Sequence, residues 1–298
     1  MHRYLCERGA LEGPHAGCRK PLPPLTAREL RLIALRQRAD CQPTHGLATP
    51  KHDLPVRIRA GALAEGMPAG DLLVLPDHAL MVDGLFVAAG HLVNGTSITR
   101  GEAAVDLTYW HIELDSHDLL MAENTPAESF LAAPGVRCGF GGVQALNAGT
   151  RPVPYASRAE LGPELAALRG RLARRAVSSG EAVGLGPVRA WLDRCVVGAN
   201  GVLHVAGWAQ DAVQPDAPVC LDVTVDGAVV AFAVAGEYRA DLAAAGVGDG
   251  RVGFDLGLDV PLASGVPHVV EVRRSADGAV VCAKQVDTAG VWTALLAA

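Results

Sequence analysis

Lysine and aromatic side chains are scarce in this chain of 298 residues, and long apolar runs are absent. Lysine occurs only at positions 20, 51 and 284, and aromatic residues make up 4% of the sequence, so the cores must be built mainly from alanine, valine and leucine. No run approaches the roughly 18 apolar residues of a membrane helix, and no apolar segment of a signal peptide is present. The sequence therefore predicts a soluble protein, and it leaves the compartment open between the cytoplasm and non-classical secretion.

Basic charge and paired cysteines are also missing. The formal net charge is −6, so no overall basic surface favours nucleic acid as a partner. The seven cysteines are scattered and include no Cys-x-x-Cys pair, which excludes zinc-ribbon and thioredoxin-type motifs by spacing. We expect Cys220 and Cys282, which fall in strand-like runs, to be free buried thiols. Two features of a metal site, i,i+4 spacing and a cysteine partner, are missing from the four histidines His78, His91, His111 and His117. We therefore expect no bound metal and no other cofactor.

Short strands joined by tight turns are what the sequence does contain, with 34 glycines and 19 prolines. Residues 27–40 have a pattern that fits either a helix or a strand. From residue 52 to about 130, alternating and short apolar runs are separated by turn dipeptides such as Asp83-Gly84. This pattern predicts a curled, antiparallel all-β domain at residues 27–135. The preceding residues 1–26 have no periodicity, and we expect them to be poorly ordered.

The second half of the chain predicts a connector and another β domain. Within a connector at residues 136–185, leucines are spaced for one helix with a solvated arginine face opposite: Leu161, Leu165, Leu168 and Leu172. Residues 186–290 alternate apolar and polar side chains, with hairpin signals at Asp226-Gly227 and Asp277-Gly278. This part predicts a β-sandwich of about 100 residues. The predicted fold class is therefore all-β, with a short helical connector between a curled domain and a sandwich.

Single polar and aromatic residues of the second domain have structural interpretations. Asp211, Asp241 and Asp255 fit turn and cap positions better than calcium ligands. Trp208 is expected to anchor the core of this domain, as Trp110 does in the first. Because no His, Asp or Cys cluster has ligand or triad spacing here, the sequence predicts no catalytic site in this half.

The stretch "DLLVLPDHALMVDGLFV", residues 71–87, places a single histidine between two apolar runs. His78 follows Pro76 and Asp77, where a strand must break. Its imidazole either has a structural role beneath the turn or serves as a catalytic acid or base. The residues alone leave both interpretations open.

Three motifs follow one another along the first domain: "DLLVLPDHALMVDG", "HLVNGTSI" and "TYWHIELDSHDLLMAENTPAES". Together they resemble the bacterial Hint domains, the Hedgehog/intein autoprocessing family, over about residues 27–130. The fold implied is a curled, horseshoe-shaped β domain. The segments "GWAQD" and "GEYRADLAAAG" are similar to β-rich C-terminal regions attached to Hint and glycan-related proteins, and no activity comes with that likeness.

The chemistry of the family gives these residues roles. A Cys or Ser attacks the carbonyl of the preceding peptide bond, and an imidazole assists departure of the amide nitrogen. The resemblance assigns the imidazole of a Thr/Ser-x-x-His motif to His78, beside Asp77, and Leu75 takes the hydroxyl position. It places His117 at the histidine of the later motif and His111 where many inteins carry an acid. The catalytic residues implied are therefore His78, His117, His111 and Asp77.

Two features of the family have no counterpart in the sequence. The opening, a Cys followed by an apolar residue and a Gly-Thr turn, is not matched around Cys6, Cys18 or Cys41. The His-Asn ending that splicing requires is replaced by "AENTPAES". We therefore expect a Hint domain related to autoproteolytic N-to-S or N-to-O acyl rearrangement, with a divergent or truncated N-terminus, incomplete or inactive in this chain.

Two partner classes follow from this sequence. The partner of an autoprocessing domain would be its own polypeptide or an upstream fused segment. The alternative function is a non-enzymatic binding module for a glycan or another cell-surface component, in which the sandwich makes the contact. An intact Cys opening in the upstream DNA would favour autoprocessing, and its absence would favour the binding module.

Overall fold

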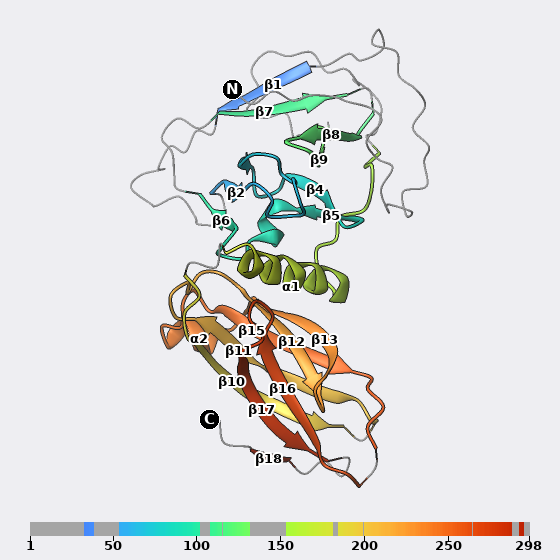
Figure 1. Ribbon diagram of the computed structural model, residues 1–298, viewed down its shortest axis with the longest axis vertical. Helices are drawn as coiled ribbons and strands as arrows, with labels where there is room; N and C mark the ends of the chain where they lie inside the picture. Colours follow the sequence, from blue (N-terminus) through green and yellow to red (C-terminus); the bar gives the residue numbers. More distant parts are fainter. Residues whose placement is uncertain are drawn as a thin grey trace. The chain divides into compact units, whose positions relative to one another are not determined.

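The computed structural model describes residues 33–38, 54–101, 108–114, 116–131, 153–180, 184–198, 200–263, 265–287 and 292–294 (Figure 1). The segment 1–26 and the three cysteines Cys6, Cys18 and Cys41 lie outside these residues. The chain divides into two compact units. The first contains the residues up to Leu92 and Ile98–Glu160, and the second contains Val93–Ser97 and Leu161–Ala298.

The first unit is built from short antiparallel strands. One sheet has the order β3-β2-β6, from Leu72–Val74, Val56–Ile58 and Ile98–Arg100. A second has the order β5-β4-β9-β8, from Leu85–Ala88, Ala79–Val82, Thr125–Glu128 and Leu119–Ala122. A third pairs β1, Ile33–Arg38, with β7, Thr108–Glu113, so the segment at 27–40 contains a strand. The 3-10 helix η3, Ala89–Leu92, follows β5.

Turn chemistry fixes the hairpins of the four-stranded sheet. Asp83 and Gly84 connect β4 to β5 with φ values of 49° and 80°. Glu123 and Asn124 connect β8 to β9 with φ values of 48° and 59°. Two successive residues with positive φ form the turn whose twist matches a two-residue hairpin. The two turns therefore fix the registers of the β4–β5 and β8–β9 hairpins, and β4 pairs with β9 between them.

The second unit consists of two antiparallel sheets and two helices. One sheet has the order β10-β11-β15-β14, from Val188–Val197, Leu203–Asp211, Arg251–Leu258 and Glu237–Tyr238. The other has the order β13-β12-β16-β17-β18, from Ala228–Ala235, Val219–Val225, His268–Arg274, Val280–Val286 and Trp292–Ala294. The helices are α1, Pro163–Ser178, and α2, Ala240–Ala244.

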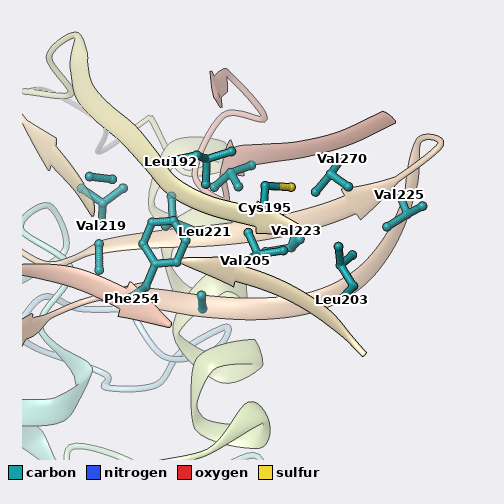
Figure 2. Close-up of a cluster of buried hydrophobic side chains, with 14 of the residues drawn as sticks. Leu192, Cys195, Leu203, Val205, Val219, Leu221, Val223, Val225, Phe254 and Val270 are labelled. Atoms are coloured by element: carbon teal, nitrogen blue, oxygen red, sulfur yellow. The ribbon is translucent and has the colours of Figure 1, made fainter. Parts of the chain in front are cut away.

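One apolar cluster joins the two sheets of the second unit (Figure 2). Leu203 of β11 and Leu221 of β12 are fully buried, and Phe254 of β15 packs into the same cluster. Helix α1 packs on β12 and β13 through its leucines, among which Leu168 is fully buried. Cys220 and Cys282 are free thiols as predicted, but only Cys220 is buried, and Cys282 is partly exposed.

The antiparallel, mostly β part of the predicted fold is confirmed. None of the sheets formed by the described strands is closed or curled. Leu161 was predicted within the helix, but it lies before the helix and is 91% exposed. Gly162 has φ at 109°, and the helix begins with Pro163, whose fixed φ suits the first helical position. No helix of the described part is long and apolar enough to cross a membrane.

Candidate histidine site

His78 follows a turn that connects β3 to β4. Its backbone N–H donates to the carbonyl of Leu75 over 3.1 Å, which closes the turn Leu75-Pro76-Asp77-His78. The carbonyls of Pro76 and His78 accept hydrogen bonds from Gly90 and Ala89, at 2.7 and 2.9 Å. Asp77 is exposed at the tip of this turn. The strand therefore breaks at Pro76 as predicted, and the backbone on both sides of His78 is held by η3.

His117 lies between β7 and β8, and its side chain is only 2% exposed. Its Nδ1 accepts a hydrogen bond of 2.8 Å from the backbone N–H of Tyr155. Its Nε2 lies 3.5 Å from Oε2 of Glu128 and has no hydrogen-bond partner. The ring of Phe86 meets the imidazole edge to face, with centroids 6.3 Å apart.

Glu128 connects the two histidine motifs. Its side chain, 9% exposed, accepts a hydrogen bond of 2.7 Å from the backbone N–H of Ala79, the residue after His78. The Nη2 of Arg158 donates to both carboxylate oxygens, at 2.7 and 2.8 Å. Burial by itself raises the pKa of Glu128, but His117, Arg158 and the Ala79 N–H together lower it to about 2. A buried carboxylate therefore stays ionised between the two histidines.

His78 experiences the same charges. Burial lowers the pKa of His78, the negative charge of Glu128 opposes this, and the positive charge of Arg158 lowers it further. His78 is therefore neutral at pH 7, where one ring nitrogen can accept a proton and the other can donate one.

The structure brings two of the four predicted residues to one carboxylate, and the side chain of His111 lies outside the described part of the chain. His78 and His117 both interact with Glu128. His111 lies in β7, where its backbone pairs with Leu35 of β1, and Asp77 points out at the turn. The catalytic roles of all four residues stay predictions. No group of three or more His, Cys, Asp or Glu side chains is placed to hold a metal ion in the described ranges.

Sequence reasoning missed four contributors to the site: Phe86, Glu128, Tyr155 and Arg158. Glu128 lies in the "AENTPAES" segment, and the burial of all four residues of β9 is known only from the structure, so the sequence held no signal for this buried carboxylate. Tyr155 and Arg158 lie in a stretch without regular structure, and no local pattern indicates their partners. They are found only from the tertiary structure.

Comparison with known proteins agrees with the sequence motifs. Residues 26–134 match the Hint domain family, a range that includes His78, His117 and Glu128 but not Tyr155 or Arg158. No curated protein and no solved structure matches the chain. By this match, the chain contains a Hint domain at residues 26–134.

Proposed function

We propose that the Hint domain of this chain carries a site for peptide-bond rearrangement, an N-to-S or N-to-O acyl shift, and that it does not cleave the chain as it stands. The observation that supports this is the neutral imidazole of His78 beside the ionised carboxylate of Glu128.

The chemistry needs a proton carrier at the scissile bond. When a thiol sulfur or a hydroxyl oxygen attacks the carbonyl, the proton of the attacking group passes to a nearby base. The amide nitrogen must then gain a proton before the C–N bond breaks. An imidazole with a lowered pKa gives up a captured proton readily, which suits it to protonate the departing nitrogen. Glu128 would stabilise the positive charge that His78 carries between the two transfers.

Two features support inactivity. Leu75 occupies the hydroxyl position and offers His78 only a backbone carbonyl, and one lost hydrogen bond to a developing charge costs on the order of 2–4 kcal/mol. None of Cys6, Cys18 and Cys41 stands in a Cys-apolar-x-x-Gly-Thr sequence. Without a nucleophile no thioester forms at all.

A reporter protein fused before Met1 is expected to stay attached. The purified fusion is incubated with a thiol or with hydroxylamine, either of which would cleave an accumulated thioester, and its mass is followed. Thiol-dependent release that His78→Ala abolishes, and that changing one of the three cysteines also abolishes, would contradict the inactive assignment. His91→Ala is the matched control, because His91 is an exposed histidine of the same domain.

We propose as a second candidate that the second unit is a glycan-binding module. Trp191 is 64% exposed on β10 and lies directly opposite Trp208 of β11, whose partly buried side chain packs against the cluster of Leu242, Val247 and Val252. Beside them, Arg239 forms ion pairs with Asp193 and Asp241, both at 2.7 Å. A flat indole face next to charged hydrogen-bonding groups suits a neutral sugar ring, which has an apolar face and a polar rim.

Replacing Trp191 with alanine is expected to abolish binding of a neutral polysaccharide while leaving the fold intact, because an exposed side chain contributes little to stability. Dextran, a soluble β-glucan and xylan are titrated into the full chain, and tryptophan fluorescence and calorimetry report binding. Val229→Ala is the control, since Val229 is 51% exposed on the other sheet. The absence of any response to all three polysaccharides would remove the glycan-binding candidate.

A further inference from the structure

A stretch of chain beyond the family match crosses the histidine site. Residues Tyr155–Ala159, which we call the strap, lie after the Hint match and before α1 and have no regular secondary structure. The strap touches the site at three places. Tyr155 donates its backbone N–H to His117, Arg158 binds Glu128, and Ala159 donates its backbone N–H to the carbonyl of Phe86 over 2.8 Å.

The first contact decides which nitrogen of His117 carries the proton. Nδ1 accepts the Tyr155 N–H at 2.8 Å, so it has no proton of its own. The proton of the neutral ring is therefore on Nε2, which is buried and faces Oε2 of Glu128 at 3.5 Å. A proton added to Nδ1 would point at the N–H of Tyr155 and break that hydrogen bond. Neither nitrogen is free to exchange protons with a substrate.

The other contacts hold the strap in place. The Nη2 of Arg158, whose side chain is 36% exposed, donates to both oxygens of a carboxylate that is 9% exposed, which makes a charge-assisted contact. The ring of Tyr155 packs edge to face on Phe86, with centroids 6.3 Å apart, and Phe86 in turn packs on His117. Side chains thus anchor the strap at both ends, while its backbone makes the contact with the imidazole.

We infer that the strap is an intramolecular latch on the Hint site: while Tyr155–Ala159 is seated, His117 is held as the Nε2–H tautomer and takes no part in proton transfer. The occupant that the latch excludes is another peptide, because the strap binds through the backbone N–H groups that any extended peptide offers. The consequence for acyl transfer rests on the proposed function. The fixed tautomer is a property of the folded chain alone.

The test uses the full chain with ¹⁵N-labelled histidine and long-range ¹H–¹⁵N spectra, which distinguish protonated from unprotonated ring nitrogens. In the unaltered chain His117 is expected to show one fixed tautomer, with Nδ1 unprotonated. Tyr155→Pro removes the N–H donor and is expected to give signals averaged between tautomers. Tyr155→Ala keeps the N–H, and the fixed tautomer is expected to survive.

A second variant tests the anchor. Arg158→Ala is expected to release the strap, so that the amides of Tyr155 and Ala159 exchange with solvent roughly ten-fold faster or more. Arg57→Ala is the control, because the Arg57–Asp71 ion pair lies in the same unit but is exposed and away from the site. A fixed tautomer in both Tyr155→Pro and Arg158→Ala would overturn the latch. Release of a fused reporter by thiol bears on the proposed function, and the tautomer of His117 bears on the latch.

Discussion

Replacing Asp211 with alanine is expected to lower the free energy of unfolding of the second unit by about 3–5 kcal/mol. The side chain of Asp211 is 6% exposed and pairs with Arg274, itself 10% exposed, at 2.9 Å. It also accepts the backbone N–H groups of Gly186, Val213 and Gln214, at 2.9 to 3.1 Å. Removal of the carboxylate leaves these donors and part of a buried guanidinium unpaired, which is the costly way to break a buried pair.

Urea denaturation of the full chain, followed by tryptophan fluorescence, measures this loss. Asp255→Ala is the matched control, because Asp255 pairs with Arg194 at 2.9 Å but the two side chains are 53% and 47% exposed. An exposed pair of this kind contributes about 1 kcal/mol or less. An equal loss of unfolding free energy in the two variants would show that the buried contacts of Asp211 do not stabilise this unit more than an exposed ion pair does.

The tight turns were the part of this fold that the sequence predicted best. Asp83-Gly84 and Asp226-Gly227 both form hairpin turns with positive φ at each residue. The interpretation of Asp211 as a turn residue also agrees with its contacts to the two N–H groups that follow it. These turns depend on a few adjacent residues, so they can be predicted directly from the sequence.

Tertiary contacts of charged groups could not be predicted in the same way. Arg158 lies 30 positions from Glu128, and Tyr155 lies 38 positions from His117. No period of helix or strand relates such residues, and a carboxylate in a turn-rich sequence looks like a solvated one until its burial is known. The motif resemblance placed His78 and His117 in one domain, but it did not predict the groups around them, Glu128, Tyr155 and Arg158.

The acid stability of the first unit is expected to depend on Glu128. A carboxyl whose pKa falls from its ordinary 4.5 to about 2 on folding stabilises the folded state by about 3 kcal/mol at neutral pH. The unfolded chain takes up this proton near pH 4.5 and the folded chain only near pH 2. The contribution is therefore complete above pH 4.5 and is lost as the pH falls through that interval.

Two other titratable groups of the first unit, His78 and Asp71, also make the folded state less stable as the pH falls. His78, with its lowered pKa, begins to favour the unfolded chain as the pH falls below 6.5. The Ala60 N–H and Arg57 lower the pKa of Asp71, but the side chain of Asp71 is 43% exposed and its effect is screened. Both groups are present in a Glu128→Gln variant, so the difference between the two proteins reports on Glu128 together with its electrostatic coupling to His78.

Glu128→Gln is expected to be less stable than the unaltered chain by about 3 kcal/mol near pH 6 and equal to it near pH 2, because a neutral amide resembles the protonated carboxyl in shape and charge. Native-state hydrogen exchange of the β4 and β9 amides reports on this unit alone. Glu65→Gln, a change at an exposed glutamate of the same unit, is expected to leave the profile unchanged. A difference that stays constant from pH 6 to pH 2 would mean that the amide disrupts packing and that ionised Glu128 does not hold the histidine site together.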